Sequence, residues 1–250
     1  MTDAFGVRGV FSVLLPATNA IVEPDMAAMR LPGVTNQSYR FAFPGLPVTV
    51  DALIELMHPA LKMALACEPD RIVVAYSPEY MPDGVAATAR LRHFFESQVS
   101  VPVTLASEAV PQALAAVGAH RIGLVTPFQA EANRNVANFF ASHGTTVVSE
   151  AGFASAEKGR AYTARISEAE VRAAFARVDT PEVDTLVQVG TALVCAGFVE
   201  SLEAAHGKPV IAVNAATYWH ALREHGFADR VAGQGRLFSA SVPRLAGPSA

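Results

Sequence analysis

Two stretches of the chain repeat one pattern, and this repeat constrains the fold more than any other feature of the sequence. The first stretch begins with RIVVAYSPEY at residues 71–80 and continues to VPVTL at residues 101–105. The second begins with DTLVQVGTALV at residues 184–194 and continues to KPVIAVNA at residues 208–215. In each stretch an apolar run ends in small or hydroxyl residues, a helical pattern follows, and a Pro-Val pair opens the next run about 25 to 31 residues later, as in a βαβ unit. Because VFSVLLPATN at residues 10–19 starts a similar unit, the repeat predicts two halves related by a pseudo-twofold, with a site between them.

Strand and helix patterns alternate along the rest of the chain. Strands are expected near residues 10–15, 71–76, 101–105, 121–126, 145–149, 184–189 and 209–213. Helices are expected near residues 49–66, 84–98, 107–118, 129–143, 167–178, 196–206 and 215–225. Most of these strands are continuous apolar runs, which indicates that helices cover both faces of the sheet. We therefore predict an α/β protein with doubly wound parallel sheets.

The composition allows such a fold and excludes several classes of function. Hydrophobic residues make up 51 % and charged residues 17 % of the 250 residues, so the chain can bury one large core or two smaller ones. With a net charge of −4 and no basic stripe, no nucleic-acid partner is expected. The longest apolar runs are far shorter than the roughly 20 residues that a bilayer requires, so no membrane partner is expected either. The high apolar fraction and the amphipathic helices are compatible with a homo-oligomer.

The N-terminus and the cysteines indicate the compartment. The opening residues MTDAFGVRGV include an Asp and have no apolar segment typical of a secretory signal. The two cysteines, Cys67 and Cys195, are too few for a disulfide scaffold. We therefore expect a cytoplasmic protein.

The expected architecture also indicates where a ligand binds. In doubly wound sheets, ligands lie outside the carboxyl ends of the strands. The residues that follow the predicted strands are Pro16 to Asn19, Tyr76 to Tyr80, Ser107, Thr126 to Phe128, Gly190 to Thr191 and Asn214. The sequence has no G-x-G-x-x-G turn after a strand, no Walker lysine motif and no histidine pair with a metal spacing and an acidic partner. The α/β pattern therefore does not imply NAD or ATP, and we expect no metal site.

Five motifs of this chain resemble those of one protein family. They are LLPATNAIVEPDM, VVAYSPEYMPDG, VTPF, VDTLVQVGTALV and KPVIAVNAATYWHALREHG. In order and spacing they are similar to the Asp/Glu racemase superfamily, and most of all to its maleate cis-trans isomerase and arylmalonate decarboxylase branch. The resemblance implies two Rossmann-like lobes, an active site in the cleft between them, and cofactor-independent chemistry on a small mono- or dicarboxylic acid. We assign residues 1–118 to the first lobe, completed by residues 215–250, and residues 119–214 to the second.

The resemblance also implies residues that bind the substrate. The family's P-x-x-N element after the first strand places an Asn on the substrate carboxylate, and this element maps onto Asn19, next to Thr18. The family's V-T-P-[YF] element carries an aromatic hydroxyl, but here the position holds Phe128, which departs from the pattern. A family loop over the substrate corresponds to EKGRAYTAR, where Arg160 would clamp a second carboxylate. The alternatives are a helix cap for Asn19 and a surface loop around Arg160.

The largest departure concerns the catalytic cysteines that the family carries at one strand end in each half. The equivalent positions hold Ser77 in the first half and Gly190 in the second, while Cys195 comes five residues later. A thiolate is nucleophilic with little help, whereas a Ser hydroxyl needs a neighbouring base. Either the register shifts so that Cys195 reaches the cleft, or this is a divergent branch that uses oxygen groups. In both cases Gly190 and Thr191 would supply backbone N–H groups at a helix N-terminus, which favours an anionic carboxylate.

The oxygen groups of the first half are candidates for this chemistry. Glu79 is the general base nearest to Ser77 in the sequence, and Tyr76 is a second candidate. Ser77 and Pro78 would line the substrate. The structural alternatives are a strand end for Ser77, lobe packing for Tyr76 and a solvated loop acid for Glu79.

Three functions from different classes are compatible with this pattern. The first is isomerisation of a maleate-type substrate, which needs a group that adds to the substrate carbon or exchanges a proton with it. The second is a hydrolase or a decarboxylase/lyase acting on a small acid or cyclic amide, with Ser77 and Glu79 in place of thiols. The third is a non-catalytic protein that binds a small acid. We expect an enzyme, since the motifs of the family extend over nearly the whole chain.

Overall fold

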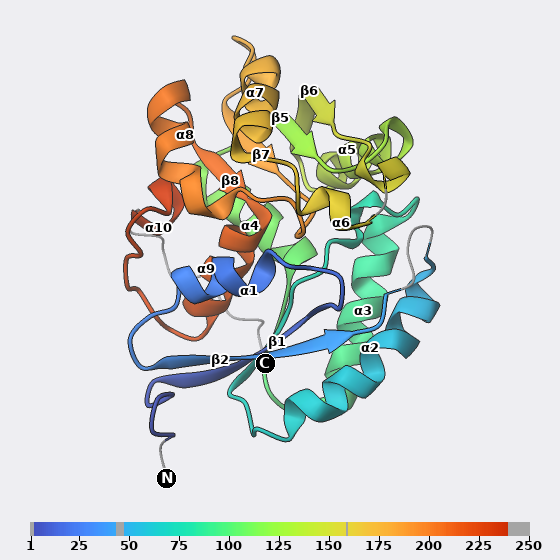
Figure 1. Cartoon of the computed structure of the whole chain (residues 1–250), viewed down its shortest axis with the longest axis vertical. Coiled ribbons are helices and arrows are strands. Elements are labelled where there is room, and N and C mark those ends of the chain that lie inside the picture. The colour runs from blue at the N-terminus through green and yellow to red at the C-terminus, as the bar shows by residue number, and fades with distance from the viewer. Residues whose placement is uncertain (1–2, 44–47, 159, 240–250) are drawn as a thin grey trace.

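The computed structural model describes residues 3–43, 48–158 and 160–239. It contains two four-stranded sheets with helices packed around them (Figure 1). The strands are β1 (Gly9–Pro16), β2 (Val34–Phe41), β3 (Arg71–Val74), β4 (Val103–Leu105), β5 (Arg121–Thr126), β6 (Thr146–Gly152), β7 (Thr185–Gln188) and β8 (Val210–Ala212). The α-helices are α1 (Val22–Ala28), α2 (Val50–Leu65), α3 (Gly84–Gln98), α4 (Ala106–Val117), α5 (Ala130–Ser142), α6 (Arg160–Thr163), α7 (Glu168–Val178), α8 (Val199–His206), α9 (Val213–Glu224) and α10 (Gly235–Ser239). Three short 3-10 helices are η1 (Pro78–Tyr80), η2 (Ser155–Lys158) and η3 (Ala196–Phe198).

Both sheets are parallel and share one strand order. The first sheet has the order β2-β1-β3-β4, and the second has the order β6-β5-β7-β8. In each sheet the first strand of the unit therefore lies inside, between the second and the third. This arrangement confirms the predicted α/β fold of two lobes, and the identical order in the two halves matches the repeat seen in the sequence.

The inner strands are buried, as their continuous apolar runs predict. β1 is buried at all eight positions, β3 and β7 at all four, and β5 at all but its first residue. Their carboxyl ends meet where the lobes join. Asn19 after β1 is hydrogen-bonded to Thr191 after β7, and the ring of Tyr80 after β3 lies 5.3 Å from that of Phe128 after β5. The strand ends of both sheets therefore face one another.

The sequence pattern did not predict β2 and α1. β2 is an edge strand that is buried only at Val34 and Phe41, and its middle is polar. Such a strand pairs on one side only and needs no apolar run. α1 has only seven residues and contains Pro24 in its first turn, where proline is tolerated. Both elements lie between β1 and β3 in the chain, so they complete the first βαβ unit.

Helix α9 packs against the first lobe although it follows the last strand of the second sheet. It begins directly after β8 and is buried at every position from Val213 to Leu222. It contacts α1, α4, β3 and β4. The lobe boundaries that we expected at residues 118/119 and 214/215 remain a prediction, and residues 240–250 lie outside the described residues. No helix in the described part of the chain is both long and apolar enough to cross a membrane.

Candidate active site

A hydrogen bond between Asn19 and Thr191 connects the two lobes at the strand ends. Asn19 Nδ2 donates to Thr191 Oγ1 over 3.0 Å, and both residues are buried. The side-chain oxygen of Asn19 accepts from the backbone N–H groups of Ile21 and Val22, at 2.9 and 3.1 Å, at the start of α1. The amide therefore has one orientation, with its NH2 group toward the second lobe. Among the described residues, Thr191 accepts from one of the two N–H groups of this amide.

Arg40 holds the same turn from the end of β2. Its Nη1 donates to the backbone oxygen of Asn19 over 2.7 Å, and its guanidinium forms an ion pair with Glu23 of α1. Thr18, in the turn itself, is exposed. The sequence pattern did not point to Arg40 or Glu23, because it did not predict the strand and the helix that carry them.

The turn after β7 is shaped for glycine at position 190. Gly190 has a φ of +93°, and a Cβ placed there would lie 2.5 Å from both Cδ and Cγ of Pro127. Gln188 fixes the turn, since its Nε2 donates to the backbone oxygens of Val189 and Gly190, each over 2.9 Å. A side chain at this position, including that of a cysteine, would require Pro127 to move. The expected equivalence of Gly190 with a catalytic cysteine position remains a prediction.

The segment after β3 brings Ser77 and Glu79 into a buried environment. Pro78 opens η1, and Ser77 and Glu79 are 5 % and 0 % exposed. Burial is the largest cause that raises the pKa of Glu79 to about 7, while its own backbone N–H and the Ser77 side chain act in the opposite direction. Among the described residues, neither the Ser77 hydroxyl nor either carboxylate oxygen of Glu79 has a partner at ordinary hydrogen-bond geometry. The expected alternative of a solvated loop acid does not fit a side chain with no exposed surface.

Comparison with known proteins shows which family this chain belongs to. The family model of arylmalonate decarboxylase matches residues 81–238, which is more than half of the chain. The chain belongs to the arylmalonate decarboxylase family. This confirms the resemblance found in the motifs. Among curated proteins, none matches this chain in sequence.

Solved structures share the fold of this family member at low sequence identity. A variant of the maleate isomerase Iso from Pseudomonas putida S16, solved with maleate, has a TM-score of 0.79 at 19 % identity, with 93 % of this chain and 98 % of that chain covered. A variant of the Nocardia farcinica maleate cis-trans isomerase, with a covalently bound succinylcysteine intermediate, has a TM-score of 0.79 at 23 % identity, with 92 % and 97 % covered. An unliganded arylmalonate decarboxylase has a TM-score of 0.74 at 20 % identity, with 92 % and 98 % covered. Proteins of this fold thus include isomerases and decarboxylases.

The two cysteines of this arylmalonate decarboxylase family member differ in their surroundings. Cys195 lies where burial opposes ionisation, and Cys67 lies away from the carboxyl ends of the strands. Cys195 is 1 % exposed, and burial is the largest cause that raises its pKa far above that of an ordinary thiol. The charge of Asp25 raises this pKa further, and Arg172 opposes the change. Cys67 contacts the hydroxyl of Ser12 at 3.2 Å, near the start of β1. Thiolate chemistry at Cys195 remains a prediction that its environment opposes.

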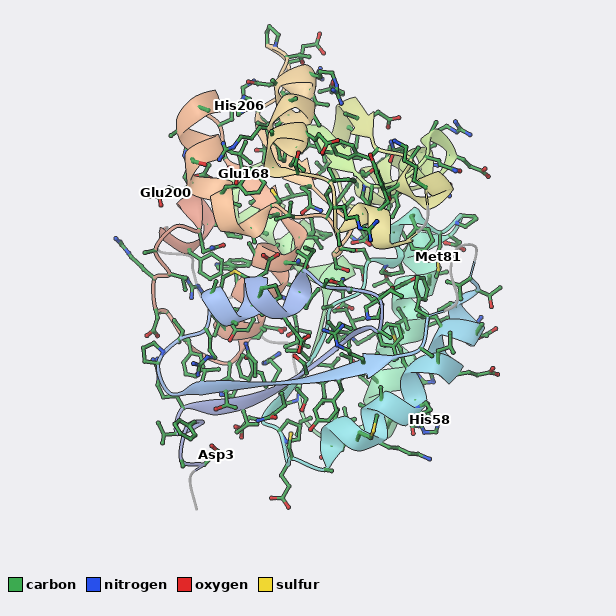
Figure 2. The ribbon with its side chains drawn as sticks, in the orientation of Figure 1. Asp3, His58, Met81, Glu168, Glu200 and His206 are labelled. Carbon is green, nitrogen blue, oxygen red and sulfur yellow. The ribbon has the colours of Figure 1, made fainter. Side chains whose placement is uncertain are left out.

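Aromatic rings line the junction around Glu79. The rings of Phe41, Phe43 and Tyr80 lie 6.1, 5.5 and 6.3 Å from that of Tyr76. The hydroxyls of Tyr76 and Tyr80 are hydrogen-bonded to each other. Phe128, in the place where the family pattern has an aromatic hydroxyl, packs on Tyr80 from the second lobe. Figure 2 shows side chains from both halves in the region between the two sheets, where Ser77, Glu79 and Thr191 are buried.

Two further polar residues, Asn214 and Asp25, are hydrogen-bonded in series to the backbone of Thr191. Asn214, at the start of α9, donates through Nδ2 to the backbone oxygen of Thr191 over 3.0 Å and to Asp25 Oδ2 over 2.8 Å. Asn214 was expected among the strand-end residues. Asp25 was not, because the pattern did not predict α1.

The segment that resembles the family's substrate loop forms η2 and α6. Arg160 is the first residue of α6, and its side chain lies outside the described part of the structure. Lys158 Nζ donates to the Tyr162 hydroxyl over 3.2 Å, and Arg165 is exposed. The expected role of Arg160 at a second carboxylate remains a prediction.

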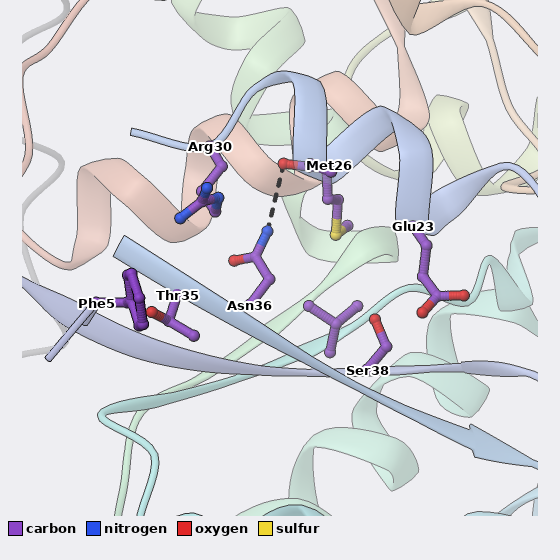
Figure 3. Close-up of a pocket in the computed structure, with 9 residues that line it drawn as sticks. Phe5, Glu23, Met26, Arg30, Thr35, Asn36 and Ser38 are labelled. Carbon is purple, nitrogen blue, oxygen red and sulfur yellow. Dashed lines mark hydrogen bonds between the residues drawn. The ribbon is translucent and has the colours of Figure 1, made fainter. Parts of the chain in front are cut away.

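A cavity of about 410 Å³ lies between α1 and β2 (Figure 3). It is lined by Phe5, Val13, Glu23, Met26, Ala27, Arg30, Thr35, Asn36 and Ser38. None of the site residues expected from the sequence belongs to this lining. The cavity is therefore separate from the strand-end site.

Proposed function

We propose that this chain is a cofactor-independent lyase that removes CO2 from a small dicarboxylic acid bound between its lobes. The observation that carries the proposal is the buried pair of Ser77 and Glu79 at the end of β3. A carboxyl group with a pKa of about 7 is a proton donor and acceptor at neutral pH. Membership of the arylmalonate decarboxylase family supports the substrate class.

In this proposal the strand ends bind the carboxylate that remains on the product. The second N–H of the Asn19 amide and the Thr191 hydroxyl face the same junction, and the backbone N–H groups beside Gly190 and Ser77 add further donors. The hydroxyl of Ser77, which has no hydrogen-bond partner among the described residues, would donate to the same carboxylate. Arg160 is the candidate partner of the second carboxylate.

The proposed step needs Glu79 as its only acid. The bond between the α-carbon and one carboxylate breaks, CO2 leaves, and the electron pair stays on the α-carbon and spreads into the remaining carboxylate. The carboxylic acid of Glu79 gives its proton to that carbon, and water returns a proton to Glu79. The aromatic rings of Tyr76 and Phe128 would exclude water, so that the developing charge is met by fixed donors.

The alternatives that the sequence left open have different support. Maleate isomerisation through a thiolate needs an ionised cysteine, as the succinylcysteine of the Nocardia relative illustrates. Here Ser77 and Gly190 occupy the expected thiol positions. Hydrolysis is the second candidate, because a buried Ser77 hydroxyl beside Glu79 has the parts of a nucleophile and its base. A protein that only binds small acids would keep Asn19 and Thr191 but would not depend on Glu79.

Turnover of a panel of substrates separates these functions. Purified wild type is incubated with malonate, alkyl- and arylmalonates, maleate and small cyclic amides in D2O, and products are followed by proton NMR. We expect release of CO2 and a single deuteron on the α-carbon of a malonate-type substrate. Fumarate from maleate would instead support isomerisation, and ring opening of a cyclic amide would support hydrolysis.

Three variants assign the acid. Glu79→Gln should lower kcat at least about 100-fold, the range that general acid–base catalysis contributes, with little change in ligand affinity. Ser77→Ala should mainly raise KM. Glu200→Gln serves as the matched control, because Glu200 is exposed on α8 (Figure 2). Full activity of Glu79→Gln would reject the proposed acid, and binding without turnover of any substrate would leave the chain as a small-acid binding protein.

A further inference from the structure

A closed chain of hydrogen bonds joins Asp25 to the strand-end site. Asn214 Nδ2 links Asp25 Oδ2, at 2.8 Å, to the backbone oxygen of Thr191, at 3.0 Å. The hydroxyl of Thr191 accepts from Asn19, and Asn19 in turn caps α1, the helix that carries Asp25. The residues joined by these hydrogen bonds lie on different elements. The bonds therefore connect α1, α9 and the turn after β7.

Asp25 and the backbone oxygen of Thr191 together hold the Asn214 amide in one orientation. Asn214 is 1 % exposed, and both bonds come from its NH2 group, while its Oδ1 has no partner among the described residues. An ionised carboxylate can only accept, so it holds the NH2 group toward itself and toward Thr191. Without the carboxylate, the NH2 group keeps only the backbone oxygen of Thr191 as a partner, so the link from Thr191 through Asn214 to α1 is lost.

A cavity lies beside the face of α1 that is turned toward β2. The 410 Å³ cavity separates part of α1 from β2, and Figure 3 shows the Asn36 amide reaching across it to the backbone oxygen of Met26 at 3.3 Å. The Asp25 contact is therefore a principal polar link between α1 and α9.

We propose that Asp25 is a positioning residue, which acts through Asn214 to fix Thr191, and with it Asn19, in the geometry that binds a ligand carboxylate. The role as a ligand site rests on the proposed function, but the coupling of Asp25 to Thr191 does not. The ionised carboxylate accepts a charge-assisted bond from the Asn214 amide, and its protonation weakens this bond and loosens the link to Thr191.

The charged surroundings of Asp25 make its own titration the expected origin of this coupling. Burial raises the pKa of Asp25 to about 6, and the Asn214 bond opposes the rise. On α1, Glu23 is paired with Arg40, and Arg30 donates to the backbone oxygen of Val34. The neighbouring group ahead of η3 is the neutral thiol of Cys195.

Two further ionisable side chains belong to elements near Asp25 and Cys195 in the described part of the chain. From α9, Tyr218 donates to Asn36, and burial raises the pKa of this phenol to about 12. Arg172 of α7 influences Cys195 and lies over the ring of Phe198.

The test follows the Thr191 methyl group in the ligand-free protein. Threonine methyl groups are labelled with carbon-13, the Thr191 signal is assigned by its loss in Thr191→Ser, and its position is recorded between pH 5 and pH 8. We expect a titration with a midpoint near 6 in wild type. In Asp25→Asn the signal should stay near its low-pH position without titrating, because a neutral Asn oxygen accepts from Asn214 without the charge of the carboxylate. In Asp25→Ala the signal should be displaced at every pH.

Two comparisons make this result decisive. Glu79→Gln should keep the titration, because Glu79 follows β3 and is not part of the hydrogen bonds that join Asp25 through Asn214 to Thr191. A Thr191 signal that does not titrate in wild type, or that titrates equally in Asp25→Asn, overturns the proposal. Failure of the proposed function is seen separately, as the absence of any shift of the same signal on adding malonate, methylmalonate or maleate to wild type at pH 7.5.

Discussion

The side-chain amide of Asn19 in the first lobe donates to the hydroxyl of Thr191 in the second over 3.0 Å, and the oxygen of the same amide accepts from two backbone N–H groups at the start of α1. Asn19 is thus a helix cap and a bridge between the lobes at once. Of the two roles that the sequence left open for Asn19, the bonds at the start of α1 match the helix cap, and the contact with a substrate carboxylate remains a prediction. Its removal is expected to affect both the stability of α1 and the geometry of the cleft.

Asn19→Ala should lower the free energy of unfolding by about 1–2 kcal/mol, since it removes a cap and a buried hydrogen bond. Thr191→Val removes only the bridge and should cost about 1 kcal/mol. Both variants should weaken binding of a small carboxylate, measured by calorimetry. Thr18→Ala is the control, because Thr18 is exposed in the same turn and its loss should change stability by less than about 0.5 kcal/mol. Equal binding by Asn19→Ala and Thr18→Ala would remove Asn19 from the site.

The buried carboxyl group of Glu79 should make the protein less stable as the pH rises. Its pKa is raised from 4.5 in the unfolded chain to about 7 in the folded protein, so the unfolded state ionises first. The penalty appears as the pH rises through 4.5 and is complete above about 7, where it is on the order of 3 kcal/mol. Urea unfolding of wild type should therefore give a lower midpoint at pH 8 than at pH 6.

Glu79→Gln isolates this contribution. The variant should lose most of the change in midpoint between pH 6 and pH 8, because it has no proton to release. Asp25, with a pKa raised to about 6, acts in the same direction mainly at lower pH, so the comparison is made above pH 6. If Glu79→Gln kept the full pH dependence of wild type, the carboxyl group would not be buried in its neutral form.

The sequence predicted the inner strands and the facing strand ends far better than the edges of the first lobe. β1, β3, β5 and β7 are covered on both faces, so their residues are continuously apolar and easily recognised. β2 pairs on one side only and carries polar residues, and α1 is a single short helix with an internal proline. Missing these two elements also meant missing Arg40 and Asp25.

The sequence pattern could not predict how deeply a given side chain is buried. Position alone suggested that Glu79 was either a base or a solvated loop acid. Only the packing of η1 against the lobe junction shows that it has no exposed surface. The conformation of Gly190 is a similar case, because a positive φ next to Pro127 depends on how β5 and β7 end side by side.

Two glycines with positive φ allow the constraint at position 190 to be separated from backbone strain. Gly190 and Gly207 have φ values of +93° and +70°, but a Cβ at Gly207 would meet nothing within 4 Å. Gly207→Ala should therefore cost about 1 kcal/mol from conformation alone. Gly190→Ala should cost at least about 2 kcal/mol more, because its Cβ would overlap Pro127. Thermal unfolding of the two variants measures the difference, and equal losses would mean that Pro127 moves freely.

Gly190→Cys should follow the same rule and should not create maleate isomerase activity in this chain. The new thiol would displace Pro127 and, with it, Phe128, whose ring Cζ is 3.6 Å from the expected Cβ. We expect a destabilised protein in which maleate is not converted to fumarate. Conversion at a rate well above wild type would show that the cleft retains the rest of a thiol-dependent site.

The two cysteines should respond differently to thiol reagents, and neither reaction should be tied to function. Cys195 is buried with a strongly raised pKa, so it should resist DTNB in the native protein and react only on unfolding. Cys67 is partly exposed and should react first. Ligand binding and turnover should survive this first reaction, and Cys195→Ala should retain both, since the proposed acid is a carboxyl group. Loss of activity in Cys195→Ala without loss of stability would overturn that assignment, because it would require the thiol to reach the substrate despite the cost of ionising it in an apolar site.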